Sequence, residues 1–366
     1  MKSLLFVGGS NRGLPYVANT SGKGIAAFRV DVETGAAEPL GVTEGIDNPT
    51  FLAVTPDGRF LCAVSEVEGW NEGTITAYAI DVATGGLTYI NKQPTRGDTT
   101  AHLGFDATGR FVASVNYTVM SMTVRPNRSV AVHPMAADGE LGPLVAEVAH
   151  EGRGPDPARQ ARPHAHCARW TPDNRFVVVA DLGIDKLITY AFDAASGKLA
   201  PHGELALPPG SGPRHFAFHP TLPFAYLINE LASTVASLAF DAAGGKFQLL
   251  GIDSAIDPAT SVKNYASAIK VAPGGRHLFA GNRGEDSLAR FDIDPASGIA
   301  RRAAATPTGK IPRDFDFAPG GNCLAVGNQG SDSVSLFRYY PEDGRLTPLG
   351  NPIAVGSPTA IAWVGA

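Results

Sequence analysis

Long apolar runs are absent from this sequence. No stretch approaches the ~18 consecutive apolar residues of a membrane-spanning helix. The apolar start at residues 1–8 is too short for a signal peptide. We therefore expect a soluble, cytoplasmic protein with no membrane partner.

Cysteine is scarce and widely spaced. The chain has three cysteines, Cys62, Cys167 and Cys323, and no CxxC motif. This argues against a disulfide framework and a zinc–thiolate site, and we expect three small core residues. No GxGxxG motif opens a helix, so no dinucleotide cofactor is expected. The formal charge is −5 and no basic stripe with interleaved aromatics is present, so nucleic acid is not an expected partner.

Turn-forming residues, in contrast, are abundant, with 42 Gly and 28 Pro in 366 residues. Such frequent turn residues predict many short elements joined by tight turns and argue against long helices. With 44% apolar residues, the chain can bury a large core.

One phrase recurs six times: an alternating apolar strand, a turn and a second strand. Its turns are spaced 46 to 65 residues apart and begin at Pro56, Ala107, Pro172, Pro220, Pro273 and Pro319. Pro followed by Asp or Gly is typical of β-turns.

A second phrase, a strand followed by a Gly-containing acidic turn, recurs seven times and is offset from the first. The copies are DVETG (31–35), DVATGG (81–86), ADGE (137–140), DAASGK (193–198), DAAGGK (241–246), DPASG (294–298) and EDGR (342–345). Together the two phrases give four strands in about 50 residues, which is the blade of a β-propeller.

The chain ends account for the missing copy of the first phrase. Residues 357–364 (SPTAIAWV) resemble the first strand at 48–54 (NPTFLAV) but lack its turn. The N-terminus supplies a second strand at 4–7, a third at 24–30 and a fourth after 35. We predict an all-β fold, a single domain over residues 1–366: a seven-bladed β-propeller with four antiparallel strands per blade, the first blade completed by the C-terminal strand. The alternative, two stacked β-sandwiches, would not share a blade between the chain ends.

Polar residues recur at one end of the predicted channel, where the longer loops open and function is expected. Six residues before each first-phrase turn are Thr50, Ala101, His166, Arg214, Ser267 and Arg313, with Thr359 as the C-terminal counterpart. The second strands end at Glu66, Asn116, Asp181, Glu230, Asn282 with Arg283, and Asn328. Convergent ionisable groups in a concavity predict a functional site.

The longest insertion, residues 149–163, opens on the same face. It carries Arg153, Arg159 and Arg162. These arginines either wall the mouth and attract an anion, or belong to a solvated basic loop.

Six short motifs carry a family resemblance that runs over essentially the whole chain. They are RPHAH (162–166), ADLG (180–183), GPRH (212–215), NEL (229–231), GNR (281–283) and IPRD (311–314). As a set they resemble the seven-bladed propeller lactonase family. The resemblance implies that the functional residues are His166, Arg214, Arg283 and Glu230. Val119 and Met120 depart from the pattern, because they are bulky where the family has small residues.

Lactone opening needs a nucleophilic water, a base, and positive charge where the carbonyl oxygen becomes an oxyanion. We expect His166 or Glu230 to activate water or relay the proton. Arg214 and Arg283 would bind an anionic substrate and the developing charge. An alternative is that Arg214 and Glu230 form a structural ion pair, which would lower the Glu pKa and make it a poorer base.

Further polar residues at this end of the predicted channel are candidate substrate contacts. They are Arg313, Asn282, Asp181, Glu66, Asn116 and His164. Asp181 also suits a loop-capping role, and His164 a structural one. One alternative is a metal held by His164 and His166, or by the carboxylate and amide side chains at this end of the channel. We expect no metal or other cofactor, because arginines can supply the positive charge.

Three functions remain open at this stage. The first is hydrolysis of a sugar-acid lactone such as 6-phosphogluconolactone or a related anionic lactone. The second is an intramolecular lyase acting on a muconate-type lactone, which the same side chains would serve. The third is a non-enzymatic scaffold. The ionisable residues at one end of the channel and the absence of a Trp-Asp repeat signature argue against it. We expect a small anionic lactone as partner, and a monomer or weak homo-oligomer.

Overall fold

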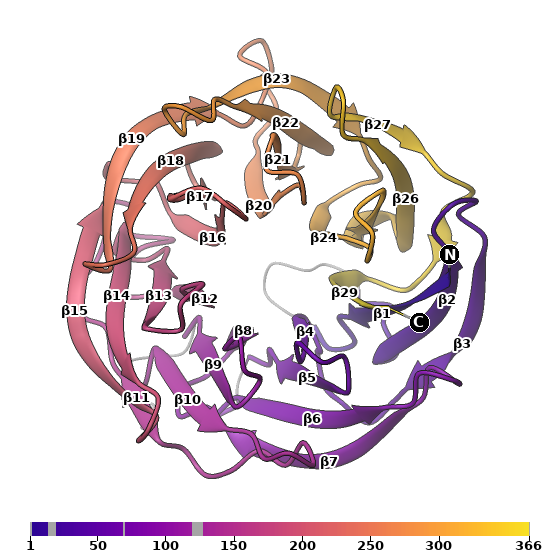
Figure 1. The fold of residues 1–366 in the computed structure, drawn as a ribbon, viewed down its shortest axis with the longest axis horizontal. Coiled ribbons are helices and arrows are strands. Elements are labelled where there is room, and N and C mark those ends of the chain that lie inside the picture. The colour runs from indigo at the N-terminus through magenta and orange to yellow at the C-terminus, as the bar shows by residue number, and fades with distance from the viewer. Residues whose placement is uncertain (1, 14–19, 69, 119–126, 366) are drawn as a thin grey trace.

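The structure is a computed structural model that describes residues 2–13, 20–68, 70–118 and 127–365. These residues form seven antiparallel sheets arranged as blades in a ring around a central axis (Figure 1). The predicted seven-bladed β-propeller is confirmed. Val119 and Met120 lie outside the described residues.

The blades are numbered along the ring, and their strands are given from the axis outward. Blade 1 contains β29 (Pro358–Gly365), β1 (Lys2–Gly9), β2 (Ile25–Asp31) and β3 (Ala37–Thr43); blade 2 contains β4 (Leu52–Val54), β5 (Phe60–Ser65), β6 (Thr74–Ile80) and β7 (Leu87–Pro94). Blade 3 contains β8 (Thr100–Phe105), β9 (Phe111–Asn116), β10 (Val130–Pro134) and β11 (Ala146–Val148); blade 4 contains β12 (Ala165–Trp170), β13 (Phe176–Asp181), β14 (Lys186–Asp193) and β15 (Lys198–Ala206).

The remaining blades repeat this order. Blade 5 contains β16 (Pro213–Phe218), β17 (Phe224–Asn229), β18 (Thr234–Asp241) and β19 (Lys246–Ser254); blade 6 contains β20 (Tyr265–Val271), β21 (His277–Arg283), β22 (Ser287–Ile293) and β23 (Ala300–Pro307). Blade 7 contains β24 (Pro312–Phe317), β25 (Cys323–Asn328), β26 (Ser333–Tyr340) and β27 (Arg345–Pro348), with β28 (Ile353–Ala354) also paired to β26.

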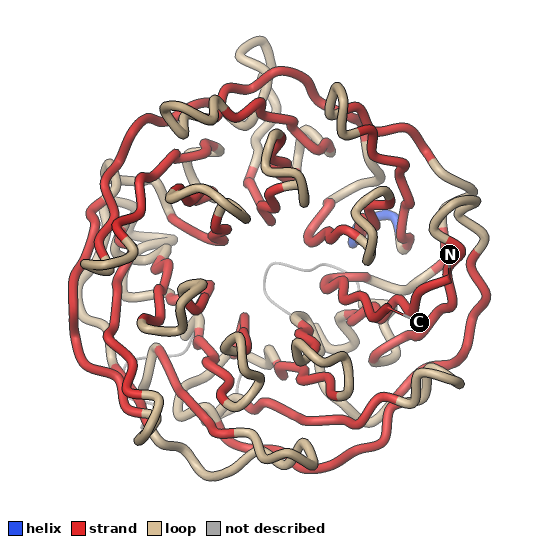
Figure 2. Tube along the Cα trace, viewed as in Figure 1, coloured by secondary structure: helices blue, strands red, loops and turns tan. Residues whose placement is uncertain are grey.

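Strands make up nearly all of the regular structure (Figure 2). In the described part of the chain the one helix is the single 3-10 turn η1 (Gln329–Ser331). None of the described helical residues forms a segment long and apolar enough to cross a membrane.

The ring is closed by the last strand of the chain. In blade 1, β29 pairs with β1 in an antiparallel register that runs from Ser3 opposite Gly365 to Gly8 opposite Ala360. The predicted completion of the first blade by the C-terminal strand is confirmed. With β29 in place, the innermost strand of every blade pairs with a second strand.

A separate hydrophobic core fills the space between each pair of neighbouring blades. The strand β29 contributes to two of them, because successive side chains of a strand point to opposite faces. Ala360, Ala362 and Val364 enter the core shared with blade 2, whereas Ile361 enters the core shared with blade 7. The three cysteines are buried, unpaired members of such cores, as expected from their spacing.

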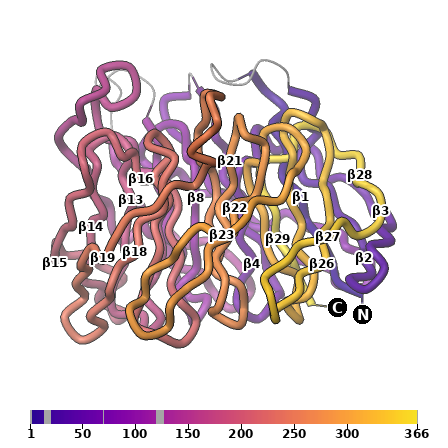
Figure 3. Tube along the Cα trace, turned by 90° about the horizontal axis from the view of Figure 1, so that it is seen from above, coloured from indigo at the N-terminus to yellow at the C-terminus, as the bar shows by residue number. Residues whose placement is uncertain are grey.

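Tight turns join the first and second strands on one face of the ring. Gly58 has a φ of 72°, and its N–H donates to the Thr55 carbonyl at 2.8 Å; Gly109 repeats both features in blade 3. The strand β1 begins and the strand β29 ends on this face (Figure 3). The first strands therefore begin on the opposite face, where the longer connections open.

Candidate active site

Five of the seven innermost strands share an irregularity at the positions counted back from the turns. Their register with the second strand shifts at Ala101 in β8, His166 in β12, Arg214 in β16, Arg313 in β24 and Thr359 in β29. A β-bulge leaves its extra residue out of the ladder and re-aims that side chain. The bulges thus explain why these positions, in blades far apart in sequence, present side chains to one common centre.

One carboxylate is shared by three guanidinium groups at this centre. Arg214 Nε lies 3.0 Å from Glu230 Oε2, and Arg283 Nη2 donates to the same oxygen at 2.7 Å. Arg159 Nη2 donates to Glu230 Oε1 at 2.5 Å. The structure therefore brings Arg214, Glu230 and Arg283 together, as the ring geometry predicted, and adds Arg159.

The charges of this cluster are strongly coupled. Burial by itself would raise the pKa of Glu230, but Arg283, Arg214 and Arg159 outweigh it and hold that pKa well below its ordinary range. Burial and the charge of Arg283 lower the pKa of Arg214 to about 9, which still leaves it protonated at neutral pH. Glu230 is therefore a permanent carboxylate, and the ion pair considered from the sequence is present.

Arg159 reaches the cluster from the insertion between β11 and β12. Its Nη2 also donates to Tyr117 Oη at 3.2 Å, and its guanidinium carbon lies 5.3 Å from the centre of the Tyr265 ring. For this residue the structure supports the mouth-lining interpretation of the loop rather than the solvated one. Tyr117 and Tyr265 were not predicted. Tyr117 directly follows Asn116, the end of a second strand, and this position could have indicated it.

His166 lies beside the arginine cluster and is 6% exposed. Its ring contacts the Tyr117 ring at 5.5 Å and the His215 ring at 5.4 Å between centroids. Its Nδ1 is buried and has no hydrogen-bond partner among the described residues. Burial, reinforced by the charge of Arg214, lowers the pKa of His166 well below its ordinary value, so the imidazole is neutral at pH 7.

Arg313 and Glu66 form a second, looser ion pair. Arg313 Nη2 lies 3.8 Å from Glu66 Oε2, and Thr50 Oγ1 donates to the same oxygen at 2.5 Å. The charge of Arg313 also helps to lower the pKa of His166. Both residues thus belong to the same end of the ring as the Glu230 cluster.

Protein groups engage the polar atoms of three predicted substrate contacts, Asn116, Asp181 and Asn282. Asn116 Oδ1 accepts from two threonine hydroxyls, while its Nδ2 donates to two backbone carbonyls. Asp181 accepts from the His164 and Gly183 N–H groups and contacts the His150 ring at 2.6 Å. Asn282 accepts from Asn264 and donates to the Ala255 carbonyl. Asp181 is therefore the loop cap considered from the sequence.

His164 contacts the same tyrosine as His166. Its Nδ1 lies 2.5 Å from the Tyr117 carbonyl oxygen, and its ring stacks on the Tyr117 ring at 4.4 Å. These contacts fit the structural role for His164. Within the described ranges, no three His, Cys, Asp or Glu side chains are close enough together to hold a metal ion.

Asp185, which sequence reasoning missed, holds two parts of the site. Its Oδ1 accepts from Gln160 Nε2 at 2.8 Å and from the Gly212 N–H at 2.7 Å. Gln160 adjoins Arg159, and Gly212 lies two residues before Arg214. Asp185 follows Asp181 by four residues, and Asp286 and Asp332 follow Asn282 and Asn328 by the same spacing. Asp286 and Asp332 accept from the backbone N–H groups of Ile311 and Ser357.

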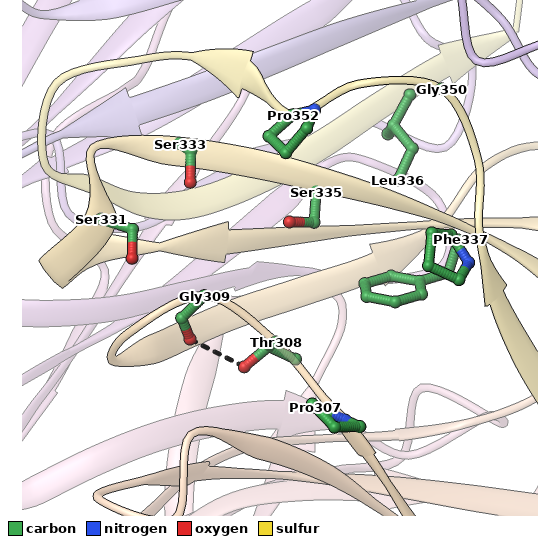
Figure 4. Close-up of a pocket in the computed structure, with 11 residues that line it drawn as sticks. Pro307, Thr308, Gly309, Ser331, Ser333, Ser335, Leu336, Phe337, Gly350 and Pro352 are labelled. Atoms are coloured by element: carbon green, nitrogen blue, oxygen red, sulfur yellow. Dashed lines mark hydrogen bonds between the residues drawn. The ribbon is translucent and has the colours of Figure 1, made fainter.

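A separate cavity of about 420 Å³ lies on the outer part of blades 6 and 7 (Figure 4). Thr308, Ser331, Ser333 and Ser335 line it together with Gly, Pro, Leu and Phe residues. None of the described residues that line this cavity has a charged side chain, and charged groups are what bind an anionic ligand most strongly.

Comparison with known proteins agrees with the fold and the motif set. A family model described as "Lactonase, 7-bladed beta-propeller" matches residues 5–363. The chain is 35% identical to a 6-phosphogluconolactonase of Bacillus subtilis over 93% of its length and 95% of the relative's, and 31% identical to a 6-phosphogluconolactonase of Formosa agariphila over 80% and 82%. The solved structure of a periplasmic gluconolactonase of Pseudomonas aeruginosa superposes with a TM-score of 0.89 at 32% identity, covering 100% of this chain and 99% of that one.

Proposed function

The chain belongs to the seven-bladed β-propeller lactonase family, and from this premise we propose that it hydrolyses an anionic sugar-acid lactone, with 6-phosphogluconolactone as the first candidate. Two curated relatives of at least 31% identity are named 6-phosphogluconolactonases. The side chains around Glu230 supply the chemical argument.

The observation that carries the proposal is the charge of the Glu230 cluster. Arg159, Arg214 and Arg283 bring three positive charges to one carboxylate, so two positive charges are not compensated within the cluster. Arg313 is matched by Glu66, and burial raises the pKa of the nearby Asp314 carboxyl. Concentrating positive charge in a buried site is costly unless an anion completes it. A phosphate group, which carries about −1.5 to −2 charges at neutral pH, matches this excess.

The arginines also retain hydrogen-bonding capacity. Arg214 donates from Nη1 to the Ser267 carbonyl, and Arg283 from Nε and Nη2 to the Tyr265 and Ala266 carbonyls. Among the described residues no group accepts from Arg214 Nη2 or Arg283 Nη1. Guanidinium N–H groups bind carboxylate and phosphate oxygens, and they stabilise an oxyanion in a water-poor site.

The reaction is the addition of water to the lactone carbonyl. His166 would take one proton from the attacking water, while Arg214 and Arg283 balance the charge of the carbonyl oxygen in the tetrahedral intermediate. The ester bond between the carbonyl carbon and the ring oxygen then breaks. His166 returns its proton to the ring oxygen, so the product is the open-chain hydroxy acid.

His166 suits the base better than Glu230 does. With Nδ1 enclosed, a water molecule would meet Nε2, which carries a lone pair when the proton of the neutral ring is on Nδ1. Glu230 is held in its ionised form by three guanidinium groups, and a carboxylate with so low a pKa is a weak base. Its role is to hold the three arginines in place.

A lactone panel with variants tests the proposal. Wild-type enzyme is assayed by acid release, above the spontaneous rate, on phosphorylated, carboxylated and uncharged lactones. We expect kcat/KM on the preferred lactone to fall at least 100-fold in His166→Ala and Arg214→Gln. His202→Ala, which removes an exposed histidine on β15, is expected to be unchanged. Near-wild-type activity in both site variants would refute the assignment, and preference for a muconate-type lactone would favour the lyase alternative.

The remaining expectations from the sequence stay predictions. They are activity without a metal or other cofactor, a monomer or weak homo-oligomer, and a cytoplasmic location. Activity after EDTA dialysis, light scattering and cell fractionation test them in turn. Fractionation has particular value because the Pseudomonas aeruginosa relative is described as periplasmic.

A further inference from the structure

Arg159 differs from the other arginines of the site in position and exposure. Arg214 lies on the innermost strand β16 and Arg283 at the end of the second strand β21, and their side chains are 3% and 15% exposed. Arg159 instead lies on an irregular loop, and its side chain is 30% exposed. It binds Glu230 Oε1, while the other two lie against Oε2. Arg159 is therefore the solvent-side member of the cluster.

The loop that carries Arg159 is fixed by hydrogen bonds. The next residue, Gln160, is fully buried, and its Nε2 donates to the Leu182 carbonyl and to Asp185 Oδ1, both at 2.8 Å. Asp156 Oδ1 accepts from the Arg159 N–H at 3.2 Å. A solvated basic loop needs no such anchoring, whereas a binding group must be held in one place.

The guanidinium group of Arg159 is only partly used by the protein. Nη2 serves both Glu230 and Tyr117. Nowhere in the described part of the chain does a group accept a hydrogen bond from Nε or Nη1. A guanidinium fork with unused donors suits two-point binding of a phosphate or carboxylate.

We propose that Arg159 binds the charged substituent of the substrate, away from the reacting carbonyl, and so makes the enzyme select a phosphorylated lactone over an uncharged one. This inference rests on the proposed function. Arg214 and Arg283 are more buried than Arg159, and the charge of Arg214 acts on His166, beside which the carbonyl reacts in the proposed mechanism. In a 6-phosphorylated sugar lactone the phosphate is at the far end of the carbon chain from the carbonyl, which corresponds to the solvent-side position of Arg159.

Paired substrates test the inference. Rates on 6-phosphoglucono-1,5-lactone and glucono-1,5-lactone are measured at constant ionic strength for wild type, Arg159→Gln, Arg159→Lys and Arg153→Gln. Arg153 is an exposed arginine of the same loop with no partner among the described residues, so its variant makes the same charge change without touching the cluster. We expect Arg159→Gln to lower kcat/KM on the phosphorylated lactone about 10- to 100-fold, mainly through KM. Its effect on the uncharged lactone should be less than threefold, with partial rescue in Arg159→Lys and little change in Arg153→Gln.

Three results overturn the inference. If wild type hydrolyses both lactones and Arg159→Gln loses the same factor on each, Arg159 merely supports the site. The same conclusion follows if Arg153→Gln has an equal effect, because the loop then acts through its general field. If wild type hydrolyses no lactone at all, the proposed function fails and the inference fails with it.

Discussion

Replacing Glu230 with Gln removes the one negative charge that three guanidinium groups share. At an effective dielectric constant of about 20, each pair of unit charges 4 Å apart interacts by ~4 kcal/mol. Because the desolvation of Glu230 is also relieved, the net cost is smaller than the sum of three such terms. Removing one partner of a buried ion pair costs about 3–5 kcal/mol, and we expect Glu230→Gln to lower the free energy of unfolding by about 4 kcal/mol.

Thermal unfolding measures this loss. At about 2.1 cal/mol/K per residue, unfolding of 366 residues has an entropy of about 0.8 kcal/mol/K. The expected decrease in Tm is therefore ~5 °C. The three unneutralised arginines should also bind sulfate or phosphate more tightly than in wild type. Either anion is expected to raise the Tm of the variant more than that of wild type.

Glu204→Gln is the matched control. Glu204 forms a single ion pair with Lys186 at 2.8 Å and is 57% exposed, so its replacement should cost less than about 1 kcal/mol. If Glu230→Gln lowers Tm no more than Glu204→Gln does, or if its Tm does not respond to sulfate, the shared-carboxylate argument is wrong.

Three further predictions concern pH and positioning. Because the pKa of His166 is lowered, kcat/KM should stay constant from neutral pH down to ~6.5 and fall only below it; an acid limb centred above pH 6.5 contradicts His166 as base. Burial lowers the pKa of His133 to about 4, offset in part by the Pro94 carbonyl. As the pH falls, His133 is therefore protonated in the unfolded state before it is protonated in the folded state. Stability is then present above about pH 6.5 and lost as pH falls toward 4. His133→Leu should therefore reduce the loss between pH 6.5 and 5 by about 2 kcal/mol in urea unfolding, and an unchanged pH dependence refutes this. Asp185→Asn should lower kcat/KM at least tenfold, and Asp332→Asn, which loosens the equivalent contact before Thr359, should not; equal losses of activity would show a general effect on stability.

The fold was readable from the sequence because its signals are local and repeated. A turn such as Pro56-Asp57-Gly58 requires particular backbone angles, and its recurrence fixes both the strand pair and the spacing of blades. Closure was readable because residues 357–364 match a first strand with no turn behind it. Counting back from the turns also located His166 and Arg214, since the bulge recurs at the same position in five of the seven blades.

The individual contacts were less predictable, because they depend on which polar groups the fold places next to each other. Asn116 and Asp181 lie at the ends of second strands, yet their polar atoms are engaged by backbone groups together with two threonine hydroxyls and the His150 ring. The pairing of Arg159 with Glu230 joins residues 71 apart in sequence, through a loop of no regular pattern. Local spacing carries no information about such a contact.

The closing strand β29 also has a consequence for synthesis of the chain. Ile361 belongs to the core between blades 7 and 1, and Ala360, Ala362 and Val364 belong to the core between blades 1 and 2. In a nascent chain that still lacks these residues, the strands of blades 2 to 7 can pair within each blade in the order in which they are synthesised. The strand β1 then still lacks its inner neighbour β29. A truncation that removes β29 would therefore leave an open arc in place of a ring.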